Sequence, residues 1–453
     1  MAQSSSPRRC LALVLAAGEG TRMRSKTPKV LHELAGLSLI GHVLKSLQMA
    51  GADEIVVVVG PDRPDVEAEV RRIDPHAGLV VQQERKGTAH ACLMASQYLS
   101  SGFDDVLVVF GDTPLVLPQT YQRLRAGLAA GSQVVALGFE ALDPHGYGRL
   151  LMAGDRLQAI REHKDCSEAE RDITLCNAGL MALDGRHVMT LLNGIGNTNS
   201  QKEYYLTDAV AVAVASGLQT GAVLAPEQEV MGINDRVQLA QAEKICQTRL
   251  RHRAMQAGVT MHDPDSVYLS YDTEFAQDVV VEPHCVFGLG VTVSTGAVIH
   301  AFSHLSGCRI GTGNSIGPFA RVRPGTQTQD GVRIGNFVEV KNADLADGVK
   351  INHLSYVGDA TVGAQTNIGA GTITCNYDGF NKHRTEIGAG AFIGSDSALV
   401  APVTIGDGAY VATGSVITES VPAYALALGR ARQVTKPERG RLLAETLEKQ
   451  SKK

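Results

Sequence analysis

The second half of the chain carries an aliphatic residue at every sixth position. The longest unbroken series consists of Ile387, Ile393, Leu399, Ile405, Val411 and Ile417. Shorter series with the same spacing comprise Ile310, Ile316 and Val322, then Leu345, Ile351 and Val357, then Val362 and Ile368. This period is typical of a parallel β-helix, in which each coil buries its inward side chains against the next coil. We therefore predict stacked coils from about Val280 to Ile417.

The first half of the chain alternates short apolar runs with longer amphipathic segments. The apolar runs are Leu11–Leu15, Ile55–Val59, Val106–Phe110 and Val134–Leu137. This alternation predicts βαβ units around a mostly parallel sheet, so the expected fold class is α/β and Rossmann-like. Ligands of such sheets gather at the carboxyl ends of the strands, where we expect the functional residues.

A helical pattern joins the two halves. Small and apolar residues recur at three- and four-residue spacing from Val237 to Ala257, and Gly258 marks the expected end of the helix. With 453 residues the chain is long enough for more than one hydrophobic core. We predict an α/β domain over residues 1–236, a helical linker over residues 237–257, and a β-helix domain with a C-terminal tail over residues 258–453.

Charge and cysteine content narrow the function classes. The net charge is -5 with both signs interspersed, which argues against a nucleic-acid-binding stripe or a polybasic membrane surface. The eight cysteines are scattered without a C-x-x-C pair, which indicates a reducing compartment and neither a disulfide framework nor a zinc site.

One short segment imitates a secretion signal. Arg8 and Arg9 precede the apolar run Cys10–Ala17. We reject a signal peptide, because the run of about eight residues leads directly into a loop that suits chemistry better than cleavage. No stretch approaches the roughly 20 apolar residues of a membrane span. We therefore expect a cytoplasmic protein without membrane insertion.

A glycine-rich loop follows the first apolar run. It reads L-A-A-G-E-G-T-R-M from Leu15 to Met23, and its small residues leave backbone N–H groups free to bind phosphate oxygens. Arg22 and Lys29 add positive charge. The loop is not a dinucleotide fingerprint, because Met23 replaces the third glycine, nor a P-loop, which requires Gly-Lys-Ser/Thr. Taken alone, it could equally be an ordinary tight turn.

Asp112 comes directly after the apolar run Val106–Phe110 and Gly111. A carboxylate at the end of a buried strand can hold a Mg²⁺ that is bound to phosphates. It can also cap a helix or a turn. Both interpretations stay open on this residue alone.

Several polar residues in the β-helix lie off the buried positions. With Ile351 and Val357 inward, His353 and Tyr356 face outward. The repeat is interrupted after Ile373, and the inserted segment Thr374–Glu386 predicts a loop that projects from one face. The alternative is a solvated histidine beside a tolerated insertion with an Asp-Gly turn, on a solenoid that only supports oligomerisation.

The glycine-rich loop as a whole resembles the signature of sugar-nucleotide pyrophosphorylases. Further motifs match that family in order. One of these motifs consists of Gln82, Gln83, Gly87 and Thr88 and resembles the segment with which the family reads uracil. The others resemble the family's sugar contacts and its second metal ligand, and they comprise Gly146-Tyr147-Gly148-Arg149, Glu162, Asn177 and Asn234.

This resemblance implies that a sugar 1-phosphate oxygen attacks the α-phosphorus of UTP and that pyrophosphate leaves. It also implies a Mg²⁺ held by Asp112 and Asn234, with Arg22 and Lys29 as catalytic cations. The implied residues for UTP and the UDP-sugar are Leu15, Ala16, Ala17, Gly18, Lys29, Gln82, Gly87, Thr88, Phe110, Gly111, Asp112, Gly148, Glu162, Asn177 and Asn234. Phe110 departs from the family, which often has tyrosine there.

The segment Asn367–Gly379, together with Arg323, Lys341, His353 and Lys382, resembles the acetyltransferase half of a bacterial bifunctional family. Each member is both an N-acetylglucosamine-1-phosphate uridylyltransferase and a glucosamine-1-phosphate acetyltransferase, and the resemblance covers essentially the whole chain. It implies a left-handed β-helix, a homotrimer, and His353 as the general base of acetyl transfer. The implied glucosamine 1-phosphate contacts are Arg323, Lys341, Tyr356 and Asn367. The implied acetyl-CoA contacts are Ala370, Asn376, Tyr377, Ser395, Thr413 and Arg430, of which Thr413 stands where alanine is more usual.

Three functions follow. The favoured one is a two-reaction enzyme that acetylates glucosamine 1-phosphate with acetyl-CoA and then transfers uridylyl from UTP to N-acetylglucosamine 1-phosphate. The second is a single-activity pyrophosphorylase whose β-helix only oligomerises it. The third is an acyltransferase for another amino sugar. Arg323, Lys341 and His353 favour the first over the second, because a stalk does not need them.

Overall fold

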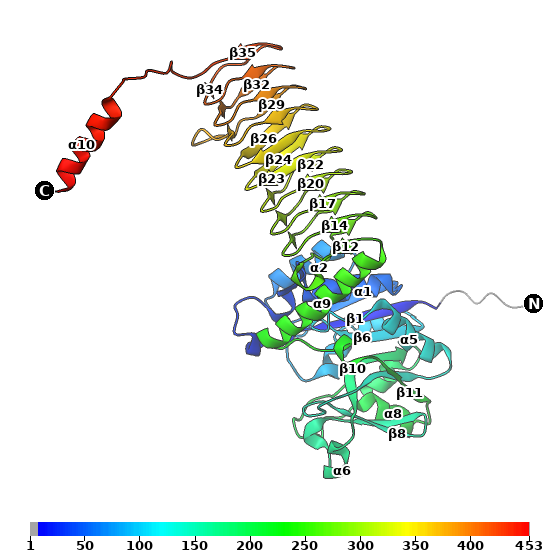
Figure 1. Ribbon diagram of the computed structural model, residues 1–453. Coiled ribbons are helices and arrows are strands. Elements are labelled where there is room, and N and C mark those ends of the chain that lie inside the picture. Colours follow the sequence, from blue (N-terminus) through cyan, green and yellow to red (C-terminus); the bar gives the residue numbers. More distant parts are fainter. Residues whose placement is uncertain (1–7, 453) are drawn as a thin grey trace, which may run out of the picture. The chain divides into compact units, whose positions relative to one another are not determined.

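The computed structural model describes residues 8–452 of the chain (Figure 1). The chain divides into two compact units, Met1–Arg249 and Leu250–Lys453. The division falls inside helix α9 (Arg236–Gln256), whose bounds differ by one residue at each end from the predicted helix Val237–Ala257. No described helix is long and apolar enough to cross a membrane.

The first unit is built around a mostly parallel sheet, as predicted. The order of its main strands is β11 (Thr220–Leu224), β7 (Val134–Glu140), β10 (Leu175–Asp184), β6 (Asp105–Phe110), β1 (Cys10–Ala16), β4 (Glu54–Val59) and β5 (Gly78–Val81). Strand β10 runs antiparallel to both of its neighbours, and the other pairs are parallel. A hairpin of β8 (Arg149–Ala153) and β9 (Arg156–Arg161) joins the sheet through β10.

The apolar runs of this sheet are continuous because both faces are covered. In β1, Ala12 and Val14 pack on the side of α1 (Leu39–Met49) and α5 (Pro118–Ala129), which contribute Leu44 and Leu124. Leu13 packs on the opposite side, with α3 (Thr88–Leu93), α7 (Val188–Asn193) and α8 (Asp208–Ala215). A parallel strand buried on both faces cannot alternate with polar residues, and this is why the runs were recognisable.

The second unit is a parallel β-helix of the left-handed hexapeptide type, and its strands form three ladders along the stack of coils (Figure 1). The first ladder consists of β12 (Thr260–Met261), β14 (Val280–Val281), β17 (Val298–Ile299), β20 (Ser315–Ile316), β23 (Arg333–Asn336), β25 (Lys350–His353), β27 (Asn367–Ile368), β30 (Phe392–Ile393), β33 (Tyr410–Val411) and β35 (Leu426–Ala427). The coils therefore begin before Val280 and end after Ile417, beyond the predicted limits at both ends.

The other two ladders share their long middle strands. One consists of β13 (Glu274–Phe275), β16 (Thr292–Val293), β19 (Arg309–Ile310), β22 (Gln327–Thr328), β24 (Glu339–Leu345), β26 (Tyr356–Val362), β28 (Ile373–Cys375), β31 (Ala398–Val400) and β34 (Val416–Ile417). The other leads from β15 (Val286–Phe287) through β18 (His304–Leu305) and β21 (Arg321–Val322) to β24 and β26, and continues into β29 (Thr385–Ile387) and β32 (Val403–Ile405). Val280 pairs with Val298, eighteen residues later, so a full coil holds three six-residue units.

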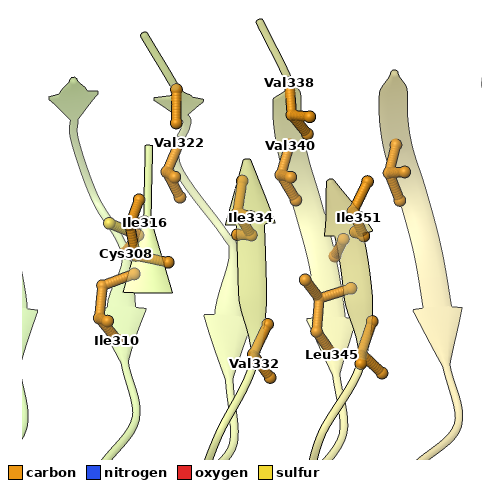
Figure 2. Packing of buried hydrophobic residues seen from close by; sticks show 14 of the residues in the cluster. Cys308, Ile310, Ile316, Val322, Val332, Ile334, Val338, Val340, Leu345 and Ile351 are labelled. Carbon is orange, nitrogen blue, oxygen red and sulfur yellow. The ribbon is translucent and has the colours of Figure 1, made fainter. Parts of the chain in front are cut away.

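The predicted inward positions are confirmed. Every aliphatic residue of the predicted series is at most 5% exposed. Figure 2 shows Ile310, Ile316, Ile334 and Ile351 among the side chains stacked in this core. The gap in the sequence pattern after Val322 has a structural reason, because the next inward position holds a threonine.

That threonine, Thr328, is buried and satisfied by the backbone. Its hydroxyl accepts a hydrogen bond from Gly311 N at 3.0 Å and lies 3.4 Å from Arg309 O. Thr374 takes an inward position in the same way, donating to Gly358 O at 3.0 Å and accepting from Gly358 N at 2.8 Å. Hydroxyl groups at these positions are tolerated because polar groups in a core need partners.

The predicted insertion is a loop between β28 and β29. Asn367 pairs with Phe392, twenty-five residues later, so this coil carries seven residues more than a full one. Tyr377 and Phe380 in the loop are exposed, and an antiparallel bridge joins Tyr377 to Lys382. The loop therefore projects from the coil, as the interruption of the repeat predicted.

Replacing Ile351 by alanine tests the inward stack. The side chain is fully buried, and its removal leaves a cavity, so we expect a loss of about 2–5 kcal/mol in stability. The matched control is Lys350→Ala on the same strand, where the side chain is exposed and the expected change is within about 0.5 kcal/mol. Urea denaturation followed by circular dichroism measures both, and equal shifts of the two midpoints would contradict the inward assignment.

Candidate active sites

The first candidate site is a cavity of about 310 Å³ at the carboxyl ends of β1 and β6. Strands β1 and β6 are parallel neighbours, with Leu15 paired to Phe110, so the loops that follow them open at the same edge. Ten of the predicted nucleotide-binding residues line the cavity: Leu15, Ala16, Ala17, Gly18, Lys29, Gln82, Gly87, Thr88, Phe110 and Asp112. Residues far apart in the sequence thus meet where the sheet topology predicts a ligand.

The glycine-rich loop needs its glycines for two different reasons. Gly18 has open space around it, so its backbone remains accessible from the cavity that it lines. Gly20 has a positive φ of 63°, and a Cβ there would lie 2.5 Å from Lys29 Cβ. The loop therefore packs closely on Lys29 while leaving the backbone near Gly18 free to approach an anion.

Four charged and polar side chains converge beside this loop. Lys29 Nζ donates hydrogen bonds to the Asp112 carboxylate and, at 3.3 Å, to Asn234 Oδ1. Arg22 also donates to Asn234 Oδ1, at 2.8 Å. The chain before α9 is tied to this point, because Ile233 N donates to Asp112 O at 2.9 Å. Asn234 does not line the cavity, but its contacts bring it to the same cluster as Asp112.

The Asp112 and Asn234 oxygens form a donor set suited to Mg²⁺. This ion prefers oxygen ligands and is commonly bound by one or two protein groups together with substrate phosphates and water. Within residues 8–452, no group of three or more histidine, cysteine or acidic side chains could hold a metal by itself. The donor set therefore fits a metal that arrives with a nucleotide.

The predicted sugar contacts meet one another outside that cavity. A Cβ on Gly148 would lie 3.5 Å from both Asn177 Cβ and Glu162 Oε2, and Asn177 N donates to Gly148 O at 2.8 Å. Burial raises the pKa of Glu162, and the Asp208 carboxylate adds to this, against a hydrogen bond from Thr207 Oγ1 at 3.2 Å. Glu162 and Asp208 line a separate cavity of about 350 Å³. Gly111 contacts the start of the glycine-rich loop, because its N–H donates to Leu15 O.

Four residues that line the cavity were not predicted from the sequence, namely Val30, Arg85, Ala91 and Glu203, and of these Arg85 contacts the glycine-rich loop through its side chain. Arg85 donates from Nε to Ala17 O at 2.9 Å and forms an ion pair with Glu19, so it binds two residues of the glycine-rich loop. Glu19 would repel a phosphate, and the Arg85 guanidinium offsets its charge. The only signal in the sequence is a charge of opposite sign in each of two loops, and nothing in the spacing connects them.

The second candidate site follows one edge of the β-helix. His353 stands two residues after the inward Ile351, and the equivalent positions after Ile368, Ile393 and Val411 are occupied by Ala370, Ser395 and Thr413. Backbone hydrogen bonds tie this edge together, with Asp396 N donating to Ala370 O and Gly414 N donating to Ser395 O. The predicted base and three predicted acetyl-CoA contacts therefore form a single row along successive coils.

The imidazole of His353 is oriented by the coil beneath it. Asn336 occupies the same position one coil earlier, and its Oδ1 lies 2.9 Å from His353 Nδ1. Because an amide oxygen can only accept, Nδ1 carries the proton in the neutral imidazole, and Nε2 of that tautomer is an acceptor on an exposed side chain. This is the tautomer in which Nε2 can act as a general base. Asn336 was not predicted, although the register of the repeat could have identified it.

A second row holds positive charge. Arg323 and Lys341 follow the paired inward residues Val322 and Val340, so they are neighbours on adjacent coils. Arg323 forms a 2.6 Å ion pair with Glu339. The ammonium group of Lys341 lowers the pKa of Lys382 in the projecting loop. Neighbouring ammonium groups of this kind suit an anionic partner such as a phosphate.

The remaining predicted contacts lie near these rows. Asn376 Nδ2 is 3.4 Å from Tyr356 Oη. Tyr377 is 60% exposed, and its hydroxyl donates to Gly379 O in the loop. Asn367 starts β27, and Arg430 approaches the row beyond Thr413, its Cδ lying 4.0 Å from a Cβ built on Gly414. Asn376 and Tyr377 thus belong to the projecting loop, whereas Tyr356, Asn367 and Arg430 lie outside both rows.

Known protein families match parts of both units of the chain. A family model described as a MobA-like NTP transferase domain matches residues 12–174, and one described as a bacterial transferase hexapeptide (six repeats) matches residues 384–419. A protein of Xanthobacter autotrophicus called Bifunctional protein GlmU is 61% identical over 95% of this chain and 96% of its own length. Proteins of that name from Azorhizobium caulinodans and Bradyrhizobium sp. (strain ORS 278) are 59% and 58% identical with the same coverage. The chain belongs to the GlmU family of bifunctional proteins.

Proposed function

We propose that the chain makes UDP-N-acetylglucosamine in two reactions. The β-helix acetylates glucosamine 1-phosphate with acetyl-CoA, and the α/β unit then transfers uridylyl from UTP to N-acetylglucosamine 1-phosphate. The observation that carries the proposal is the row of His353, Ala370, Ser395 and Thr413 on one edge of the β-helix. An oligomerisation stalk needs no oriented imidazole, so the single-activity alternative leaves this row without a purpose.

In the uridylyl transfer, a phosphate oxygen of N-acetylglucosamine 1-phosphate attacks the α-phosphorus of UTP. The new P–O bond forms as the bond to the β-phosphate breaks, and pyrophosphate leaves. Such transfers depend on positioning and on charge neutralisation. Backbone N–H groups near Gly18 bind the phosphates, while Arg22 and Lys29 neutralise the charge that develops. Asp112 and Asn234 hold a Mg²⁺, which supplies further neutralisation when bound.

Substrate selection in this unit divides between its two clusters. Gln82, Gly87 and Thr88 line the nucleotide cavity and contact the uracil. Gly148, Glu162 and Asn177 meet outside that cavity and contact the N-acetylglucosamine moiety.

In the acetyl transfer, His353 Nε2 removes a proton from the glucosamine amine as the nitrogen attacks the thioester carbonyl. The C–N bond forms, the C–S bond breaks, and the CoA thiolate leaves and takes up a proton. Imidazole suits this role because it titrates near neutral pH. Arg323 and Lys341 hold the sugar phosphate, with Tyr356 and Asn367 on the sugar. Ala370, Asn376, Tyr377, Ser395, Thr413 and Arg430 bind acetyl-CoA.

The assembly in which these reactions run is a homotrimer in the cytoplasm. The match to the bacterial transferase hexapeptide model supports a trimer, the state that the family resemblance implies. Small molecules are the partners in this proposal, namely glucosamine 1-phosphate, N-acetylglucosamine 1-phosphate, UTP and acetyl-CoA. An acyltransferase for a different amino sugar would use the same rows but would reject glucosamine 1-phosphate.

Replacing His353 by alanine separates the two reactions. We expect CoA release from acetyl-CoA and glucosamine 1-phosphate to fall by about 10²–10⁴-fold, the usual contribution of general base catalysis. Pyrophosphate release from UTP and N-acetylglucosamine 1-phosphate stays near normal. The control is His304→Ala, another exposed histidine of the β-helix, which should change neither rate. Equal loss of both activities, or loss of neither, would contradict the separation of roles.

Replacing Asp112 by alanine tests the metal ligand. We expect Mg²⁺-dependent pyrophosphate release to fall by at least about a hundredfold, because several kcal/mol of charge stabilisation are lost. CoA release should not change. Asp155→Ala, in the exposed turn between β8 and β9, is the matched carboxylate control and should preserve both rates. Uridylylation at the normal rate in Asp112→Ala would rule this residue out as the ligand.

A further inference from the structure

A ladder of three polar side chains crosses the coils beside the proposed acetyl transfer site. Asn342, Asp359 and Asn376 occupy the same position in three successive coils, because Lys341 pairs with Gly358 and Tyr356 with Ile373. Asp359 Oδ1 accepts from Asn342 Nδ2 at 2.6 Å, and Asp359 Oδ2 accepts from Asn376 Nδ2. The central carboxylate therefore holds one amide from the coil on each side.

Asp359 is buried and remains ionised. Its residue is 7% exposed. Burial raises its pKa, but the hydrogen bonds from Asn342 and Asn376, with the nearby Lys341 and Lys382 charges, outweigh that and hold the pKa below the usual range. An ionised carboxylate can only accept hydrogen bonds. The side chain of Asn376 must therefore turn its Nδ2, and not its Oδ1, toward Asp359.

This contact determines what Asn376 can offer to a ligand. Its Nδ2 is used by Asp359 and lies 3.4 Å from Tyr356 Oη. Among residues 8–452, no hydrogen bond reaches its Oδ1. This atom is also not fully buried, because it is absent from the buried side-chain atoms that lack a partner. The carbonyl oxygen is thus the end of the amide that remains available to a substrate.

We propose that Asp359 is a positioning residue of acetyl transfer, which locks the Asn376 amide so that only its carbonyl oxygen faces the substrate. The inference rests on the proposed acetyltransferase function. A carbonyl oxygen accepts from an N–H donor, and both substrates carry one, the glucosamine amine and the amides of the pantetheine arm. An amide that could turn over would present its NH₂ group half of the time and would repel that donor.

Three variants of the full-length protein test this role. Asp359→Ala frees the amide, so we expect KM for one substrate to rise by about tenfold, the usual effect of losing one hydrogen bond. The matched control Asn342→Ala removes the other hydrogen bond of the same carboxylate but leaves Asn376 locked, and KM should stay within about twofold.

The third variant, N342D/D359N, exchanges the carboxylate and the amide between two neighbouring coils. The carboxylate, now at position 342, accepts from the amide Nδ2 at position 359. The amide oxygen at position 359 therefore still faces Asn376 and accepts from its Nδ2. We expect this double variant to recover nearly normal KM.

Steady-state CoA release is measured while glucosamine 1-phosphate and acetyl-CoA are varied in turn, and the substrate whose KM changes identifies the N–H donor. The side chains of N342D/D359N keep the size and the hydrogen bonds of the three polar residues. The proposal would therefore be overturned if this double variant folds but stays as impaired as Asp359→Ala, or if it does not fold. Equal effects of Asp359→Ala and Asn342→Ala would also overturn it. Pyrophosphate release reports folding independently, and absence of CoA release from the unsubstituted protein would instead refute the acetyltransferase function itself.

Discussion

The burial of one aliphatic side chain in every six residues is the constraint on which the second unit depends. A single coil cannot bury its inward side chains by itself. Ile316, Ile334 and Ile351 are therefore shielded from water only because their coils stack on neighbouring coils. Stacking fixes the register, since each strand must pair in parallel with the equivalent strand of the next coil. Residues at equal positions of successive coils are therefore forced into rows, and a row is enough to build a site.

In the first unit the pairing of strands in the sheet likewise brings residues that are distant in the sequence next to one another. Because β1 and β6 are parallel neighbours, the loop around Gly18 and the loop at Asp112 leave the sheet at the same edge. Lys29 and Asn234 then close the cluster through side-chain contacts with Asp112. Both sites are thus made from regular elements that bring short polar segments together, and in the second site the projecting loop adds Asn376 and Tyr377.

Periodic and continuous apolar patterns made much of the fold predictable. The inward series, the first strands of the sheet, the joining helix and the projecting loop all follow from local patterns, since burial imposes a period on the sequence. The antiparallel β10 and the inward Thr328 were not predicted, because pairing direction and hydroxyl partners are set by residues distant in the chain. In the sites, motifs identified most of the residues. The register of the repeat could also have identified Asn336 beside His353, but nothing in the sequence connects Arg85 with Glu19.

Product analysis tests the central claim that one chain houses two separate catalysts. The purified protein is incubated with Mg²⁺, UTP and acetyl-CoA and with a panel of sugar 1-phosphates, and the products are identified by mass spectrometry. The account predicts UDP-N-acetylglucosamine from glucosamine 1-phosphate only when acetyl-CoA and UTP are both present, and from N-acetylglucosamine 1-phosphate with UTP alone. Formation of a UDP-sugar without any acetylation of glucosamine 1-phosphate would contradict it, because the β-helix would then be a stalk.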